Sequence, residues 1–386
     1  MKISALASEP HFVDHLAPVW DLIPPELRGK FYTGERGGTG SLARTRKLGV
    51  QSVQSGLPVG RGIVLCAASG DLAKTTNTAP HARVAFFEHG CGLSYNTRQS
   101  SYAGAISRPN VDLFIFPNEF SAAKQREVHD RRIESIGSSP RLDRWVGVER
   151  SAGEKPVVAI SFHWDCHVVP ETRSALYFYR RHLHELCQRG WTVLGHAHPR
   201  MIGHAGVAYR QAGITLVEDF NEIMERADLY AVDNSSTLYE FAALDRPVVA
   251  MNCPRYRRGV SHGLRFWDNV PGLQCDQPED LADVIAAALE DPPEAQKLRR
   301  DAVDVVFPLN DGRAAERAAG LVLELWGQLE ANYPDSEVPT GRARVEYIVT
   351  NPAGESIERF LVADEARRMA RKRGDGWDVA EVRVAI

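Results

Sequence analysis

Several histidine, arginine and hydroxyl side chains directly follow short apolar runs of strand length. The sequence EHGCG places His89 after one run, HPR places His198 and Arg200 after a second, and DNSS begins at Asp233 after a third. Imidazole is the side-chain group able to take a proton from an alcohol near neutral pH. Guanidinium, hydroxyl and backbone N–H groups bind phosphate. These residue types fit proton transfer from an alcohol beside a bound phosphate.

The stretch at residues 227–252 is expected to form a strand, a capped helix and a second strand. Unpaired N–H groups and the helix dipole attract anions to such a helix start, which predicts a phosphate cradle at the carboxyl edge of a parallel sheet. The predicted phosphate-binding residues are Asp233, Ser235, Ser236 and Thr237. The alternative is an ordinary capped helix, in which Thr237 and Glu240 form a capping box.

The two histidine motifs suggest different tasks. His89 is the candidate general base, and Gly90 would let a ligand approach the backbone closely; the alternative is a structural histidine that caps a turn. His198 and Arg200 could stabilise a diphosphate in the absence of a metal ion. Arg200 could instead form a surface ion pair.

The chain has 386 residues, enough for two main domains and a small addition. Its composition is that of a soluble globular protein, with 44% hydrophobic and 25% charged residues, and its net charge of −4 gives no general attraction to nucleic acid or anionic membranes. Neither a signal peptide nor a membrane-spanning run is evident, and the six cysteines are scattered. We therefore expect a cytoplasmic protein with reduced thiols.

Alternating strands and helices predict an α/β protein with parallel, doubly wound sheets. We expect domains at residues 1–150 and 151–330, a linker at 331–342 and a small β-β-α-β module at 343–386. The segment 137–143 is the candidate hinge between the domains. Residues up to 61 are expected to mix helical patches with turns, and single helices are expected at 121–133, 170–189 and 313–329.

In order and spacing, five motifs resemble those of the CDP-glycerol glycerophosphotransferase family, the teichoic-acid primases and polymerases. They are EHGCG, GSSPRLD, HAHPR, DNSSTLYEFAALDRPVV and NDGRAAER, and together they cover roughly residues 80–320. The chain departs from the family pattern in reading DNSS rather than DYSS and in carrying Cys91 in the first motif. The first 60 residues and the tail after Gly341 match no pattern that we can name.

The resemblance implies a GT-B fold, in which two Rossmann-like domains with parallel sheets face a central cleft. The N-terminal domain would be the acceptor side and the C-terminal domain would bind the nucleotide donor. A polyol phosphate would pass from a CDP-linked donor to an acceptor hydroxyl, which attacks the β-phosphorus as CMP leaves, without a metal ion or a further cofactor. The resemblance also suggests Glu240 as a ribose ligand.

Two further clusters could contact the substrate. The sequence HWDCH at residues 163–167 contains metal-ligand residue types, but its spacing is not that of a zinc site and no partner motif accompanies it. In the resemblance this segment faces the cleft, so His163 and His167 are possible substrate contacts. Arg255 and Arg257 in the sequence PRYRRG are also possible contacts, and a solvated basic loop is the alternative.

Other functions remain open on the same scaffold. The chain could be a nucleotide-sugar glycosyltransferase, a UDP-sugar 2-epimerase or a non-catalytic nucleotide-binding or assembly protein. We expect no nucleic-acid partner, membrane contact that is peripheral at most, and possible homo-oligomers through the C-terminal module. The sequence does not identify the acceptor or the donor base.

Overall fold

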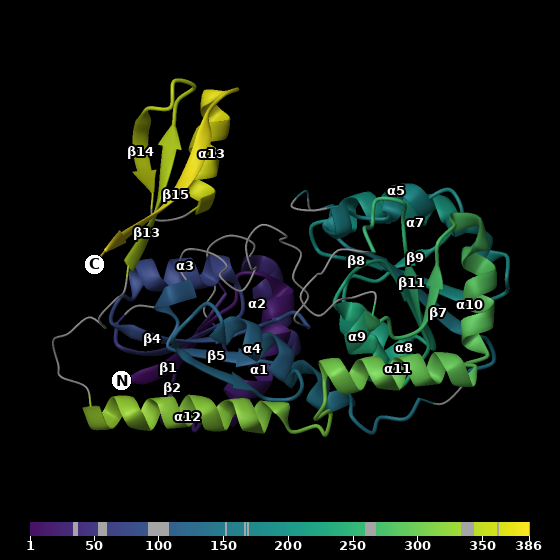
Figure 1. The fold of residues 1–386 in the computed structure, drawn as a ribbon, viewed down its shortest axis with the longest axis horizontal. Coiled ribbons are helices and arrows are strands. Elements are labelled where there is room, and N and C mark those ends of the chain that lie inside the picture. The colour runs from purple at the N-terminus through teal and green to yellow at the C-terminus, as the bar shows by residue number, and fades with distance from the viewer. Residues whose placement is uncertain are drawn as a thin grey trace. The chain divides into compact units, whose positions relative to one another are not determined.

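The computed structural model describes residues 1–33, 38–52, 60–91, 108–150, 153–165, 167, 170–258, 268–332, 343–360 and 363–385. They form two compact units, each with its own parallel sheet (Figure 1). The first unit lies within Met1–His89, Tyr102–Asp143 and Arg313–Ile386, and the second within Gly90–Ser101 and Arg144–Gly312. The chain thus leaves the first unit at the end of the candidate hinge segment.

The first unit contains a six-stranded sheet of order β2-β1-β3-β4-β5-β6, with every neighbouring pair parallel. Its strands are β1 (Lys2–Leu6), β2 (Arg28–Tyr32), β3 (Gly62–Cys66), β4 (Ala82–Phe87), β5 (Leu113–Phe116) and β6 (Arg132–Ser135). Its first four helices are α1 (Pro10–Leu22), α2 (Gly38–Lys47), α3 (Ser69–Thr78) and α4 (Glu119–Arg126). The strand order reverses at β1, which has β2 on one side and β3 on the other. The carboxyl ends of β1 and β3 therefore border a topological switch point, where open α/β sheets bind ligands.

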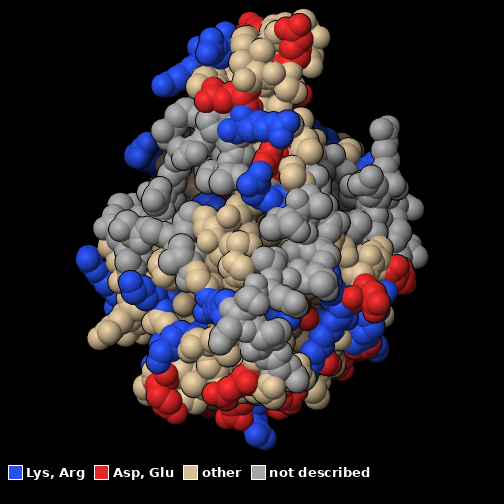
Figure 2. All heavy atoms as spheres, turned by 90° about the vertical axis from the view of Figure 1, so that its left-hand side faces the viewer, with Lys and Arg blue, Asp and Glu red and all other residues tan. Residues whose placement is uncertain are grey.

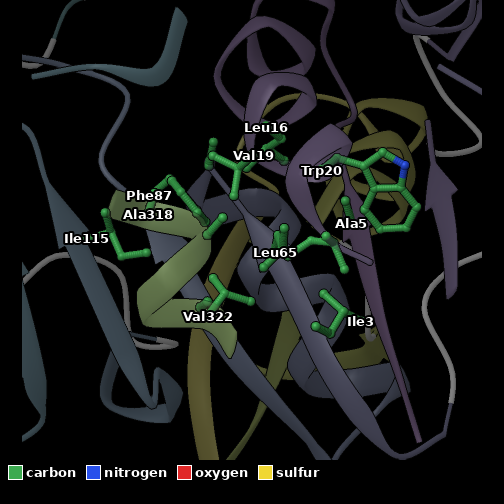
Figure 3. Close-up of a cluster of buried hydrophobic side chains, with 14 of the residues drawn as sticks. Ile3, Ala5, Leu16, Val19, Trp20, Leu65, Phe87, Ile115, Ala318 and Val322 are labelled. Atoms are coloured by element: carbon green, nitrogen blue, oxygen red, sulfur yellow. The ribbon is translucent and has the colours of Figure 1, made fainter. Parts of the chain in front are cut away.

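Buried side chains fill both faces of this sheet. On one face, strand residues such as Ile3 and Leu65 pack against Leu16 and Trp20 of α1 and against Val322 of α12 (Ala314–Asn332), as Figure 3 shows. The opposite face packs against α3 and α4 through a second cluster that includes Leu72 and Ala122. Helices thus cover both faces, as an all-parallel sheet requires.

The second unit contains a parallel six-stranded sheet of order β12-β11-β10-β7-β8-β9. Its strands are β7 (Val157–Phe162), β8 (Thr192–Ala197), β9 (Thr215–Leu216), β10 (Leu229–Val232), β11 (Val248–Met251) and β12 (Leu273–Cys275). Its helices are α5 (Leu176–Tyr179), α6 (Leu183–Cys187), α7 (Ile202–Ala212), α8 (Phe220–Arg226), α9 (Thr237–Ala242), α10 (Leu281–Leu289) and α11 (Pro293–Val306). Here the order reverses at β7, so the switch point lies between β7 and β10. Both parallel sheets confirm the expected α/β class.

A small antiparallel sheet follows, of order β14-β13-β15. It is built from β13 (Ala343–Thr350), β14 (Ser356–Phe360), α13 (Ala363–Arg373) and β15 (Asp378–Ala385), which is the β-β-α-β order expected from the sequence. Tyr347 and Val349 of β13 pack with Ala366 and Ala370 of α13 in a small core.

The start of α12 is fixed by a residue far away in the sequence. Asp143, the last residue of the PRLD motif, accepts hydrogen bonds from the N–H groups of Ala314 at 3.0 Å and Ala315 at 2.7 Å. Arg317 then donates from Nε to the carbonyl of Ile136 at 2.7 Å. The GSSPRLD and NDGRAAER motifs are therefore in contact, and this contact attaches α12 to the first unit. From the sequence, this helix was expected to belong to the second domain, at residues 151–330.

Three local predictions were wrong. The single helix at 121–133 is instead α4, which begins after Asn118 because its Oδ1 accepts the N–H of Ser121, followed by the edge strand β6. The single helix at 170–189 is broken into a 3₁₀ turn (Pro170–Thr172), α5 and α6. The first 61 residues contain strands β1 and β2, which the sequence analysis missed.

Within the described residues, we find no helix of sufficient length and apolarity to cross a lipid bilayer. On the face drawn in Figure 2, basic and acidic side chains are interspersed. This pattern agrees with the small net charge.

We expect Asp143→Ala to destabilise the first unit by about 1–2 kcal/mol, because two N–H groups at the start of α12 lose their acceptor. Hydrogen-exchange mass spectrometry should detect faster exchange in the first turn of α12. Glu324→Ala serves as the control, since Glu324 lies beyond the first turn of α12 and its exposed side chain pairs with Arg132 at 2.6 Å. Equal exchange in the two variants would contradict the capping role.

Candidate functional site

The candidate base His89 follows β4 at the carboxyl edge of the first sheet and is partly exposed. Its ring lies edge-on to Phe12, with centroids 4.9 Å apart, and to His11 and His15, each at 6.2 Å. Its Nδ1 atom is buried and has no hydrogen-bond partner among the described residues. A Cβ added at the neighbouring Gly90 would meet nothing within 4 Å, so the backbone is open there.

The residues of α1 that surround His89 were not found from the sequence. His15 is buried, and its Nδ1 lies 3.4 Å from the Ser139 hydroxyl in the GSSPRLD motif. Burial, followed by the nearby positive charge of Arg141, holds the pKa of His15 well below its usual value. His15 is therefore neutral at pH 7. The spacing of His11, Phe12 and His15 on one helix, at i, i+1 and i+4, could have indicated this aromatic surface.

In the second unit, Asp233 follows β10 and is fully buried. Its Oδ1 accepts the N–H of His163 at 2.7 Å, and its Oδ2 accepts the N–H of Ala175 at 3.0 Å. Burial raises its pKa to about 7, although these N–H groups oppose the shift. Asp233 was expected to bind phosphate or nucleotide; both of its oxygens instead fix the loop that follows β7.

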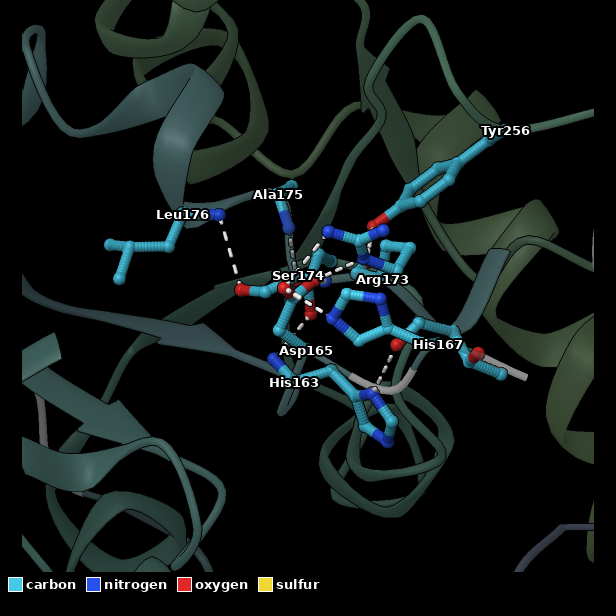
Figure 4. A network of polar contacts seen from close by, with 10 residues as sticks. His163, Asp165, His167, Arg173, Ser174, Ala175, Leu176 and Tyr256 are labelled. Atoms are coloured by element: carbon cyan, nitrogen blue, oxygen red, sulfur yellow. Dashed lines mark hydrogen bonds and ion pairs between the residues drawn. The ribbon is translucent and has the colours of Figure 1, made fainter. Parts of the chain in front are cut away.

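The residue after β7, His163, has a defined tautomer. Its Nδ1 lies 3.2 Å from the carbonyl of Thr172, an acceptor only, so Nδ1 must carry the proton and Nε2 a lone pair (Figure 4). Burial lowers the pKa of His163 below its usual value. His163 is therefore a neutral hydrogen-bond acceptor at its Nε2 atom.

His198 and Arg200 lie near His163 at the same sheet edge. The rings of His163 and His198 have centroids 5.6 Å apart, and the ring of Trp164 lies 6.0 Å from His198. The Arg200 guanidinium lies over Trp164, 4.9 Å from its centroid, and the backbone N–H of Arg200 donates to His198 Nδ1 at 3.2 Å. The structure thus places His163 beside His198 and Arg200, a pair that was predicted from a different motif.

The hydroxyl residues at the start of α9 form local hydrogen bonds. Ser235 and Thr237 are partly exposed, and their hydroxyl oxygens are 3.0 Å apart. Ser236 is the N-cap residue, and its side chain makes no capping hydrogen bond. The expected capping box of Thr237 and Glu240 is therefore wrong: Thr237 is already inside the helix. Glu240 is only 4% exposed, which leaves little of its carboxylate open to a ribose.

Most of the other expected substrate contacts are held in ion pairs. Asp165 binds Arg173 through two hydrogen bonds of 2.6 and 3.0 Å, and His167 Nε2 lies 3.3 Å from its Oδ2 (Figure 4). Arg257 binds the fully buried Glu171 through Nε at 2.6 Å and Nη2 at 2.7 Å.

Arg255 is exposed. In the part of the chain that the structure describes, no three His, Cys, Asp or Glu side chains are placed to hold a metal ion. Cys166, from the HWDCH sequence, lies outside the described residues.

A pocket of about 510 Å³ lies at the opposite, amino edge of the second sheet. It is lined by residues that include Trp145, Arg150, Asp228 and Arg246. None of the predicted site residues is among those that line it. Ligands of parallel sheets bind at the carboxyl edge, so we take the edge that carries His198 and Ser235 as the candidate site.

Residues 166–324 match the model of the family described as CDP-Glycerol:Poly(glycerophosphate) glycerophosphotransferase. In structure, the chain is similar to the wall teichoic acid polymerase TagF, with a TM-score of 0.59 and 14% identity over 86% of this chain and 90% of that chain. It is also similar to UDP-GlcNAc 2-epimerase from Neisseria meningitidis bound to UDP-GlcNAc, with a TM-score of 0.55 and 11% identity over 84% and 100%. A putative UDP-N-acetylglucosamine 2-epimerase from Listeria monocytogenes gives a TM-score of 0.56 and 13% identity over 86% and 97%. No curated protein matches the sequence.

The two parallel sheets and these structural neighbours show a GT-B fold, and the family that residues 166–324 match is one of transferases. Over residues 166–324 the chain carries the sequence pattern of the CDP-glycerol glycerophosphotransferases, so the resemblance inferred from the motifs is confirmed.

We expect the His163 imidazole to titrate below its usual pKa of about 6.5, because burial disfavours its charged form. The folded state then binds this proton more weakly than the unfolded chain, so His163 lowers stability as the pH falls below that value. NMR titration of the imidazole nitrogens, assigned with His163→Asn, should give the low midpoint and the Nδ1-protonated tautomer. A midpoint at or above 6.5 would contradict the geometry.

Proposed function

We propose that the protein moves a polyol phosphate, such as glycerol phosphate, from a CDP-linked donor to an acceptor hydroxyl. The family match over residues 166–324 supports this chemistry. The observation that carries the proposal is the group formed by His163, His198 and Arg200 at the carboxyl edge of the second sheet, after β7 and β8. Such an edge supplies imidazole, guanidinium and N–H donors to a diphosphate.

In this proposal, His89 is the general base. It removes the proton of the acceptor hydroxyl as the oxygen attacks the β-phosphorus, and the bond from that phosphorus to the bridging oxygen breaks to release CMP. The aromatic surface formed by His11, Phe12 and His15 supports this role because it fixes the orientation of the ring. The ring is partly exposed while Nδ1 is buried, which leaves Nε2 to face a substrate.

The diphosphate would be stabilised by groups of the second unit, without a metal ion. The Arg200 guanidinium lies over the Trp164 ring, which favours one orientation before a ligand arrives, and the Arg200 backbone N–H donates to His198 Nδ1. Ser235 and Thr237 would add hydroxyl donors from the start of α9. One preorganised donor of this kind lowers a barrier by about 3 kcal/mol. The neutral His163 would accept a hydrogen bond from a donor hydroxyl rather than bind phosphate.

We expect His89→Asn to slow CMP release from CDP-glycerol by about 10²–10⁴-fold, because the general base is lost while the donor groups stay intact. The measurement is chromatography of CMP with glycerol as the acceptor, in EDTA, which should leave the wild-type rate unchanged. His184→Asn is the matched control, since His184 is exposed and bonded only locally, to the carbonyl of Arg181. A wild-type rate in His89→Asn would remove His89 from the mechanism, and loss of activity in EDTA would require a metal.

We expect CDP and CMP to raise the melting temperature more than UDP, GDP or ADP, since ligands stabilise the state that they bind. Arg200→Ala should reduce the shift produced by CDP, because one diphosphate contact is lost. Stabilisation by UDP or UDP-GlcNAc in place of CDP would favour an epimerase or a sugar transferase on this fold. Nucleotide binding without turnover of any donor would favour a binding protein.

A further inference from the structure

A buried carboxylate that belongs to none of the motifs bridges the switch point of the first sheet. Asp71 lies in the first turn of α3, just after β3, and is fully buried. Its Oδ2 accepts the N–H of Ser8, which follows β1, at 3.0 Å. The carboxylate therefore spans the ends of the two strands at which the sheet order reverses.

The same arrangement occurs in the second unit, with one difference. There Asp233 follows β10 and accepts the N–H of His163, which follows β7, and its other oxygen accepts the N–H of Ala175. In the first unit the other oxygen, Asp71 Oδ1, is buried and has no hydrogen-bond partner among the described residues. A buried carboxylate oxygen without a donor is unfavourable, so this position suits a donor that a ligand brings.

The surroundings of Asp71 Oδ1 restrict which kind of hydrogen-bond donor could bind there. Burial raises the pKa of Asp71 to about 6, although the hydroxyl and N–H of Ser8 and the charge of Lys74 oppose the shift, while Glu9 adds to it. Two carboxylates would repel a phosphate. A metal ion needs several oxygen ligands, and the described residues provide no such group. A neutral hydroxyl remains, which donates one hydrogen bond and adds no charge.

Asp71 lies at the same sheet edge as the proposed base, His89. Strands β3 and β4 are paired, with Cys66 opposite Phe86, and neighbouring strands lie about 4.8 Å apart. Asp71 follows the first of these strands and His89 the second, so both belong to one edge of one sheet. The first turn of α1 follows β1 and contributes His11 to the surroundings of His89. A Cβ added at Gly70 meets nothing within 4 Å, which leaves space at the start of α3.

We propose that the acceptor binds at the carboxyl ends of β1 and β3, and that Asp71 Oδ1 receives a hydrogen bond from one of its hydroxyl groups. The acceptor is accordingly a neutral polyol or sugar at the end that reaches Asp71. This inference rests on the proposed transfer to a hydroxyl, and it makes Asp71 a binding residue rather than a second base.

The test is an NMR titration of the wild-type protein with glycerol and ribitol, with the amide of Ser8 as the reporter. Both polyols should shift this amide, since its acceptor is the carboxylate that they would contact. Asp71→Asn should weaken the polyol affinity by about tenfold or more, as expected when a hydrogen bond to a charged group is lost. The folding of this variant is favoured because the neutral amide is nearly isosteric and can still accept the Ser8 N–H.

Asp112→Asn is the matched control. Asp112 is a carboxylate at the amino edge of the same sheet, and both of its oxygens are occupied, by Arg83 Nη1 and the N–H of Val84, each at 2.8 Å. It should leave polyol affinity unchanged.

The inference is overturned if neither polyol shifts the Ser8 amide, if Asp71→Asn binds them as the wild type does, or if inorganic phosphate alone shifts that amide. The titration of the wild type decides this even if Asp71→Asn does not fold. CDP binding, measured in the same samples, reports on the proposed function separately.

Discussion

Both parallel sheets depend on a buried carboxylate that bridges the place where the strand order reverses. At that place the connections leave for opposite faces of the sheet, so the N–H groups that follow the first strand have no partner in the ladder. Asp233 satisfies two of them in the second unit, and Asp71 satisfies one in the first. Burial works against the charge of both side chains and raises their pKa values. The hydrogen bonds to backbone N–H groups are what keep these carboxylates in place.

The chemistry of the second unit follows from this constraint. Asp233 accepts the N–H groups of His163 and Ala175, and in the same loop the Thr172 carbonyl lies 3.2 Å from His163 Nδ1. That contact decides the tautomer. The two histidines therefore differ in their hydrogen-bonding roles. His163 presents a lone pair at Nε2, whereas His198 uses Nδ1 to accept the backbone N–H of Arg200. Position in the fold, rather than residue type, assigns their roles.

Local patterns were enough to predict the strands that carry chemistry. The apolar runs before His89 and Asp233 are buried strands, and the motif order predicted the GT-B class. What the sequence could not give is the pairing of distant groups. Asp143 appeared to be part of a hinge, yet its carboxylate holds α12, 171 residues away in sequence. Asp233 appeared to be a phosphate ligand because it opens a hydroxyl-rich turn, but burial directs it to backbone N–H groups. His15 and Asp71 lie in segments without any motif, and only the fold brings them to the sheet edge.

The comparison of the two units also explains why the first one is suited to an uncharged ligand. In the second unit, Arg200 and the α9 hydroxyls lie at the carboxyl edge of the sheet, and both oxygens of Asp233 accept backbone N–H groups. In the first unit, Asp71 and Glu9 remain beside the switch point, and the nearby imidazole of His15 is kept neutral by burial. In the proposed transfer, the second unit would hold the diphosphate and the first would hold the acceptor hydroxyl, and the two units differ in which oxygens of the buried carboxylate at the switch point are already occupied.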